Sequence, residues 1–252
     1  MAQFQSYVIC TSPRSGSTLL CRLLREAGNA GFPDSHFHAP DVEKWLGYYG
    51  LRSDQFSTSK DALKAIFEAA LLRGRGGSKI FGLRLQRHSF DYFAQQLSLL
   101  HPSLPDDRSR IDAVFGTTLF IHLTRQNKLD QAISYVRATQ SGLWHAAPDG
   151  TEIERQSEPQ EPVYDAAAIA EQLELCEQMD AEWQAWFRNE DIHPLQVTYD
   201  DLAAAPYGTL AKVMKALGLE HKQRAEARPP TAKLADATNQ EWADRFRSEA
   251  QR

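Results

Sequence analysis

The sequence has few cysteines, no long apolar run and no excess of charge of one sign. Its three cysteines, Cys10, Cys21 and Cys176, lack metal-ligand spacing and lie among apolar residues, which argues against a disulfide framework and a zinc site. The early apolar run from Tyr7 to Cys10 is too short for a signal sequence or a membrane span. We therefore expect a cytoplasmic protein without an integral membrane segment.

The charge balance provides no long-range field of either sign. The 252 residues include 28 Lys and Arg against 33 Asp and Glu, a net charge of -5, so we expect no nucleic-acid partner. An anionic ligand would need a local basic pocket. No linker rich in Gly, Ser or Pro divides the chain and no repeat is visible, so residues 1–252 are expected to form a single domain.

Strand and helix patterns alternate along the chain, which indicates an α/β protein with a mainly parallel sheet between layers of helices. Strands are expected at 6–10, 79–85, 117–123 and 195–199. Helices are expected at 17–27, 62–72, 126–140, 165–188, 209–217 and 241–250, with another through Tyr92 and Leu99. Residues 142–164 contain several prolines and glycines without a period and are expected to be a long loop.

The first expected strand runs directly into a loop rich in hydroxyl groups, residues 11–18, and then into a helix. Backbone N–H groups and the positive end of a helix attract anions in this context. Compared with the pattern G-x-x-x-x-G-K-[ST], Gly16 and Thr18 are in place, but Thr11 replaces the first glycine and Ser17 the lysine. The loop is therefore similar to a phosphate-binding loop but lacks its usual cation.

Arg14 provides a cation from within this loop. No strand pattern ends in an aspartate that is placed to bind magnesium, so magnesium ATP is disfavoured and no metal site is expected. A serine-rich turn in which Ser15 or Ser17 caps the helix is the alternative explanation. The whole pattern, between strand and helix, favours an anion site in a P-loop-like three-layer fold.

Three segments carry a resemblance to a known family. Residues 12–20, Ser-Pro-Arg-Ser-Gly-Ser-Thr-Leu-Leu, resemble the 5′-phosphosulfate-binding loop of sulfotransferases that use 3′-phosphoadenosine 5′-phosphosulfate (PAPS), specifically the bacterial trehalose 2-sulfotransferase-like family. Residues 122–125 and 131–138 are similar to that family's 3′-phosphate motif. Residues 240–247 are similar to its closing segment.

This resemblance implies a sulfotransferase that uses PAPS as co-substrate and sulfates a hydroxyl, with a carbohydrate or glycolipid as the expected acceptor. It also implies a homodimer. The implied cofactor-binding residues are Arg14, Ser15, Gly16, Ser17, Thr18 and Leu19 for the phosphosulfate, and Arg125 and Ser134 for the 3′-phosphate. A P-loop kinase and a non-catalytic nucleotide-binding protein remain the alternatives. The kinase would need the missing lysine and a magnesium carboxylate, and the binding protein would need no base.

Sulfuryl transfer needs a group that removes the acceptor proton. Where the trehalose enzyme has a glutamate after the first helix, this sequence has Ser35. The neighbouring His36 is expected to be the catalytic base, because an imidazole accepts a proton near neutral pH. His38, Asp34 and His145 are the alternatives.

Four further residues are assigned to the reaction. Arg14 is expected to be catalytic as well, because its charge suits the departing phosphate. Arg84 is expected to contact the phosphosulfate or the acceptor. Trp144 and His145 are expected to bind the substrate, because an aromatic face and an imidazole suit a sugar. Trp144 could equally fix the loop to the core.

Overall fold

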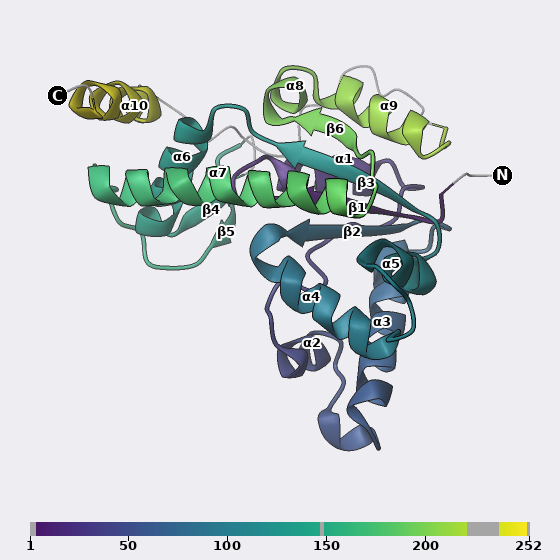
Figure 1. Cartoon of the computed structure of the whole chain (residues 1–252). Helices are drawn as coiled ribbons and strands as arrows, with labels where there is room; N and C mark the ends of the chain where they lie inside the picture. Colours follow the sequence, from purple (N-terminus) through teal and green to yellow (C-terminus); the bar gives the residue numbers. More distant parts are fainter. Residues whose placement is uncertain (1–3, 147–148, 221–236, 251–252) are drawn as a thin grey trace.

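Four parallel strands form the central sheet in the computed structural model, which describes residues 4–146, 149–220 and 237–250 (Figure 1). Neighbouring strands are parallel throughout. In order across the sheet they are β2 (Phe81–Gln86), β1 (Ser6–Thr11), β3 (Thr118–Thr124) and β6 (Leu195–Thr198). Each strand lies where the sequence predicts one, and the expected α/β class is confirmed.

Alternate side chains of β1 enter two different cores, as the period of a strand requires. Val8 and Cys10 pack with helices of the lower layer in Figure 1, and Tyr7 and Ile9 pack with those of the upper layer. All six residues of β1 are buried. A strand buried on both faces has no polar side, which is why these β-rich runs were visible in the sequence.

Helices cover both faces of the sheet. One face is covered by α2 (Val42–Tyr48), α3 (Ser59–Arg75), α4 (Arg87–Leu100), α5 (Asp107–Phe115) and the end of α7 (Ala166–Asn189). The other is covered by α1 (Ser17–Glu26), α8 (Tyr199–Ala204) and α9 (Pro206–Ala216). A smaller cluster joins α7 to α6 (Lys128–Ser141) and α10 (Ala237–Ala250). A short 3-10 helix, η1 (Ser53–Gln55), precedes α3. None of the helices in the described ranges is long and apolar enough to cross a membrane.

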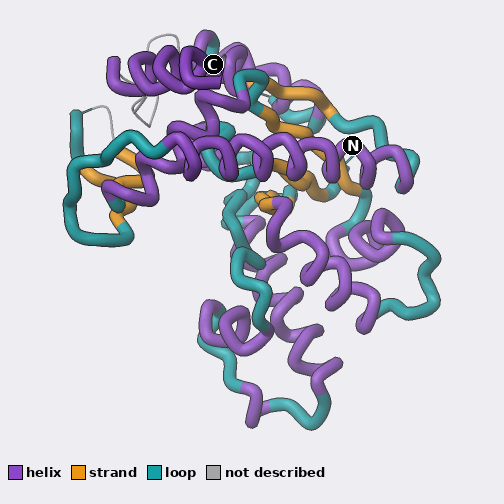
Figure 2. Tube along the Cα trace, turned by 60° about the vertical axis from the view of Figure 1, so that its left-hand side comes forward, coloured by secondary structure: helices purple, strands orange, loops and turns teal. Residues whose placement is uncertain are grey.

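The structure corrects the expected long loop at 142–164. Two short strands, β4 (Leu143–Ala146) and β5 (Glu152–Arg155), pair there as an antiparallel ladder apart from the main sheet (Figure 2). Gly142 begins it with a positive φ of 72°, and its carbonyl accepts a hydrogen bond from the Gln156 N–H. Four-residue strands with an irregular register leave no period in the sequence, so the pattern could not reveal them.

Three short helices, α2, α5 and α8, are also absent from the sequence-based expectations. Each begins at a side chain that accepts a backbone N–H: Asp41 for α2, Asp106 for α5 and Thr198 for α8. These caps are the usual start signal of a helix, and they could have been found.

Gly31, between α1 and α2, packs directly against the backbone at the start of β2. We therefore expect Gly31→Ala to destabilise the protein more than Gly28→Ala. Both glycines have φ +79°, which costs an alanine about 1–2 kcal/mol. At residue 31 a Cβ would also lie 2.5 Å from the carbonyl oxygen of Ile80, whereas nothing lies within 4 Å at residue 28.

The backbone clash should add about 1–3 kcal/mol to the loss for Gly31→Ala alone. Chemical denaturation of the two variants measures this difference. Equal losses in the free energy of unfolding would contradict the tight packing at residue 31.

Candidate functional site

A cavity of about 740 Å³ opens at the carboxyl ends of β1, β2 and β3. Its walls also include the start of α1, the inner side of α6 and α7, and the hairpin β4–β5. Most of the residues that the sequence assigned to a site meet here: Arg14, Gly16, Ser17, Thr18, Leu19, Arg84, Arg125, Ser134, Trp144 and His145. Ser15 and His36 are absent from the lining.

The loop between β1 and α1 leaves the start of the helix without a side-chain cap. Gly16 is the N-cap residue, at φ 86°, and it has no side chain that could accept a hydrogen bond from the first turn. The alternative explanation, a cap by Ser15 or Ser17, is therefore wrong. Ser15 is fully buried and its hydroxyl donates to the Ser12 carbonyl at 2.8 Å. The first backbone N–H groups of α1 therefore remain available as hydrogen-bond donors, and a bound anion could accept from them.

Two arginines crowd together at one end of the cavity. Arg14, at φ 63°, donates from Nε to Ser134 Oγ at 3.0 Å and from Nη1 to the Trp144 carbonyl. Arg125 is 5% exposed and stacks 4.5 Å from the Tyr199 ring centre. Burial and the charge of Arg125 lower the pKa of Arg14 to about 10. A bound anion stabilises two guanidinium groups that repel each other where solvent reaches them only in part.

Carboxylates offset this charge only in part. Arg125 lies 3.7 Å from Asp130, a long ion pair. Within the described ranges, Arg14 has hydrogen bonds to neutral partners and no ion pair. The end of the cavity formed by these two residues is therefore cationic, although the whole chain has a net charge of -5.

Arg84 connects the loop at the start of α1 to the chain that follows this helix. It donates to Thr18 Oγ1 at 3.0 Å and to Ser35 Oγ at 2.8 Å, and lies 3.8 Å from Asp34. Asp34 also pairs with Arg25 at 3.0 Å. Ser35, at the position where the resemblance implies a glutamate, is thus a hydrogen-bond partner of Arg84.

Trp144 and His145 are neighbours on strand β4, and both line the cavity. His145 Nε2 lies 3.0 Å from Thr18 Oγ1 and 3.6 Å from Glu154 Oε2. Burial, together with Arg14 and Arg84, lowers the pKa of His145 to about 3, so this imidazole is neutral at physiological pH. Trp144 packs edge-on against Tyr135 at 5.4 Å between ring centres.

The structure contradicts the expected catalytic role of His36. Its side chain is 1% exposed, stacks on Phe81 and donates from Nε2 to the Phe32 carbonyl at 3.4 Å. Burial lowers its pKa to about 4. A base has to reach the acceptor hydroxyl, and His36 is turned into the core instead.

Sequence reasoning missed part of the cavity wall. His88, on the first turn of α4, lines the cavity beside His38, which was only an alternative base. Tyr199 lies beneath Arg125. Gln86 and Gln156 also line the cavity. No sequence pattern marks His88 at the start of a helix. Tyr199, by contrast, ends the last strand pattern and could therefore have been predicted to lie at the cavity.

The chain is an α/β protein with an uncapped helix start, a hydroxyl-rich loop and two neighbouring arginines at the end of a parallel sheet, an arrangement that suits an oxyanion. A model of the family described as Stf0 sulphotransferase matches residues 6–249, so the chain belongs to the Stf0 sulphotransferase family. This confirms the resemblance seen in the sequence.

Two curated relatives carry the name trehalose 2-sulfotransferase. The chain is 30% identical to the one from Mycobacterium tuberculosis and 28% identical to the one from Mycolicibacterium smegmatis. Each match covers 98% of this chain and 96% of the relative. Among solved structures, the sulfotransferase domain of the Synechococcus PCC 7002 olefin synthase matches with a TM-score of 0.42 and 18% identity, covering 96% of this chain and 86% of that one.

The buried position of His36 predicts how stability depends on pH. Its folded-state pKa, about 4, lies below the ordinary value of 6.5, so the unfolded chain takes up the proton first as the pH falls. The free energy of unfolding should therefore decrease between pH 6.5 and pH 4, by on the order of 3 kcal/mol from this residue.

His36→Phe keeps an aromatic ring beside Phe81 but cannot titrate. We expect a flatter stability profile for this variant between pH 6.5 and pH 4, measured by urea denaturation. His193→Phe, at an exposed histidine, should keep the wild-type profile. A His36→Phe profile parallel to the wild type would show that His36 is not a buried neutral group.

Proposed function

We propose that the protein transfers a sulfuryl group from PAPS to a hydroxyl of a carbohydrate or glycolipid. The observation that carries the proposal is that Arg14 and Arg125 lie together at one end of the cavity, where burial and the charge of Arg125 lower the pKa of Arg14. PAPS has a phosphosulfate and a 3′-phosphate, and thus enough negative charge for both guanidinium groups. Membership of the Stf0 sulphotransferase family supports the same chemistry.

Arg14 lies between the residues proposed for the 5′-phosphosulfate and those proposed for the 3′-phosphate of one nucleotide. Arg14 and the start of α1 would hold the 5′-phosphosulfate, and Arg125 with Ser134 would hold the 3′-phosphate. The hydrogen bond from Arg14 to Ser134 brings these two sites side by side. A second cavity of about 390 Å³ also borders Arg14 and Ser134 and gives room for the rest of the nucleotide.

Transfer of a neutral SO3 unit depends on alignment and on stabilising the charge of the departing phosphate. Arg14 and the amides at the start of α1 would supply this stabilisation, because negative charge grows on the 5′-phosphate as its bond to sulfur breaks. Arg84 hydrogen-bonds Thr18 and would fix the end of the loop nearest the acceptor.

The cavity lining also contains side chains that suit a polyhydroxylated acceptor. Four are glutamines and two are glutamates: Gln86, Gln156, Gln172, Gln178, Glu154 and Glu182. Amides donate and accept hydrogen bonds, as sugar hydroxyls do. The two relatives named trehalose 2-sulfotransferase support a sugar acceptor, and Trp144 offers an aromatic face. Resemblance also supports a homodimer.

A non-catalytic nucleotide-binding protein is the second candidate. The observation that favours it is Ser35, which is hydrogen-bonded to Arg84 where the resemblance implies a catalytic glutamate. Detection of a sulfated product from labelled PAPS with a panel of sugars, glycolipids and small alcohols separates the two candidates. The P-loop kinase is disfavoured because Ser17 replaces the lysine of the phosphate loop.

Binding of 3′,5′-adenosine bisphosphate, the product of PAPS, should raise the melting temperature. At 100 times the dissociation constant, a ligand that binds only the folded state adds about 2.7 kcal/mol, which for this size corresponds to about 5–10 °C. Magnesium ATP should give a much smaller shift in the same thermal assay. Equal or greater stabilisation by magnesium ATP would reject the proposed nucleotide.

Arg125→Ala should weaken binding of 3′,5′-adenosine bisphosphate by about 10- to 100-fold, because a hydrogen bond to a charged group contributes about 1.5–3 kcal/mol. Binding of 5′-AMP, which lacks the 3′-phosphate, should change little. Calorimetric titration compares the two nucleotides. Arg108→Ala, at an exposed arginine that bonds the Asp191 carbonyl, is the matched control. The same loss for both nucleotides would assign Arg125 to the fold alone.

A further inference from the structure

The acceptor side of the cavity contains several groups that could take a proton, and most of them already have partners. His145 contacts Thr18 and Glu154 through the same nitrogen. Glu154 also accepts a hydrogen bond from Gln156 at 2.9 Å. Glu182 pairs with Arg87 at 3.0 Å.

Outside the lining, two of the expected bases are also engaged. Asp34 pairs with Arg25 and Arg84, and His36 faces Phe81 in the core. Neither can approach an acceptor hydroxyl without breaking these contacts.

His38 and His88 differ from all of these groups. Both side chains line the cavity and are exposed, and in the described part of the chain neither ring nitrogen forms a hydrogen bond or an ion pair. Their ring centres lie 5.1 Å apart with an interplanar angle of 88°, so the edge of one ring meets the face of the other. The pair is therefore an accessible, unoccupied proton acceptor on the cavity wall.

The fold holds His38 beside the phosphate loop. Phe37, the preceding residue, is fully buried, with its ring 5.0 Å from the rings of Trp45 and Phe93. Three residues before His38, Ser35 accepts the hydrogen bond from Arg84, which also reaches Thr18. The hydrogen-bonded Ser35 and the buried Phe37 both precede His38 and fix the backbone that leads to it at the cavity rim.

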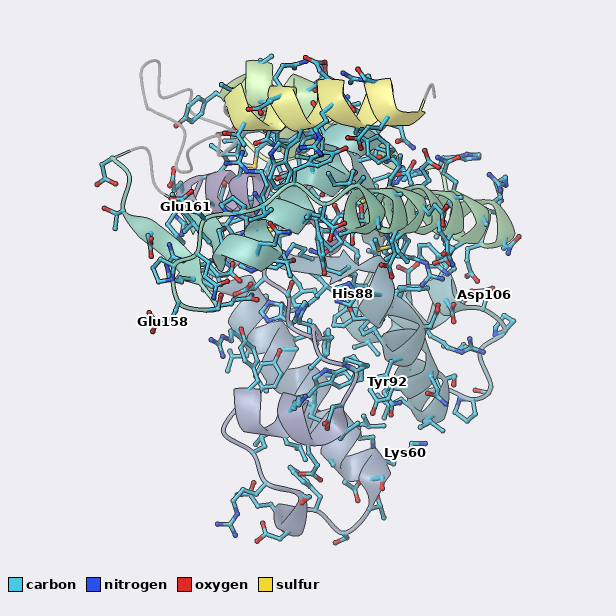
Figure 3. The ribbon with its side chains drawn as sticks, turned by 90° about the vertical axis from the view of Figure 1, so that its left-hand side faces the viewer. Lys60, His88, Tyr92, Asp106, Glu158 and Glu161 are labelled. Carbon is cyan, nitrogen blue, oxygen red and sulfur yellow. The ribbon has the colours of Figure 1, made fainter. Side chains whose placement is uncertain are left out.

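His88 reaches the same place from another element. His88 lies two residues after the end of β2, on the first turn of α4. Its position near the middle of the molecule is labelled in Figure 3. Ser89 and Phe90, the next residues, are buried and fix this turn.

We propose that His38 removes the proton from the acceptor hydroxyl, and that His88 positions the His38 ring. The proposal rests on the sulfuryl transfer proposed above and names the proton acceptor at a site where Ser35 replaces a carboxylate. A ring nitrogen of His38 takes the hydroxyl proton while the hydroxyl oxygen forms a bond to sulfur. The bond between sulfur and the bridging phosphate oxygen breaks, its electron pair stays on the phosphate, and the imidazolium then returns its proton to water.

The surroundings keep both rings able to accept a proton at neutral pH. Burial and the charge of Arg84 on β2 lower the pKa of His38, while Glu154 on β5 raises it. Burial and His38 lower the pKa of His88. A positive charge on one ring opposes a positive charge on the other.

Steady-state sulfation of trehalose, glucose and methyl glucoside with labelled PAPS tests the proposal. His38→Ala should lower kcat by about 10²-fold or more, since general-base catalysis contributes 10²- to 10⁴-fold. The dissociation constant for 3′,5′-adenosine bisphosphate should stay within twofold. The decline of the rate at acidic pH should disappear, and added imidazole should restore part of the activity.

His88→Ala should cause a smaller loss and should move the apparent pKa of the acidic limb, which a purely structural role would not do. The double variant should be no slower than His38→Ala, because the two rings act on one proton. His193→Ala, at an exposed histidine outside the cavity, should match the wild type.

The outcomes separate this proposal from the proposed function. A wild-type protein that sulfates a sugar, with His38→Ala within threefold of it, overturns the role of His38 alone. A wild-type protein that fails to bind 3′,5′-adenosine bisphosphate overturns the proposed function. If PAPS binds and none of the three sugars is sulfated, release of sulfate to water is compared in the same variants. An unchanged rate for His38→Ala then overturns the proposal.

Discussion

The repulsion between the buried Arg125 and the half-buried Arg14 is the constraint on which the site depends. Arg14 and Arg125 come from loops that follow two neighbouring strands, β1 and β3, so the parallel sheet itself forces them together. Folding without a ligand has to desolvate both charges and leave them close. The surrounding structure offsets this cost with neutral groups: the Ser134 hydroxyl and the Trp144 carbonyl for Arg14, and the Tyr199 ring for Arg125. Neutral partners hold the guanidinium groups in place without neutralising them, which preserves their attraction for an anion.

Other parts of the fold fix the ends of these strands. At the end of β3, Asp180 on α7 accepts hydrogen bonds from His122 and Thr124 and lies 3.3 Å from Lys128. Burial alone would raise the pKa of Asp180, but these bonds and the charge of Lys128 hold it well below its ordinary range. At the end of β1, Trp183 on the same helix donates to the Thr11 carbonyl at 2.8 Å. Helix α7 thus anchors both strands just before the loops that carry the arginines.

The sequence predicted the elements whose burial or spacing produces a pattern of residues. It did not predict which side chains of an irregular segment point into the cavity and which point into the core. Buried parallel strands leave apolar runs, and a loop between strand and helix at Gly16 leaves a recognisable spacing. The expected role of His36 as the base depended instead on the directions in which the side chains of residues 34–36 point. Irregular backbone has no period, so nothing in the sequence distinguishes the buried His36 from the exposed His38. The same reasoning applies to His88, whose place on the cavity wall comes from the end of β2 and the start of α4.

Ser35 and Arg84 together explain why a carboxylate would be a poor base at position 35. A glutamate there would face the Arg84 guanidinium, which now donates to Ser35 Oγ at 2.8 Å and already lies beside Asp34. An arginine with five donors pairs strongly with a carboxylate and lowers its affinity for a proton. The serine hydroxyl accepts one hydrogen bond and leaves another donor of Arg84 for Thr18 on the phosphate loop. In the proposed reaction Arg84 serves the loop, and the acceptor proton goes to the imidazoles of His38 and His88 on the cavity wall, which have no hydrogen bond to Arg84 in the described part of the chain.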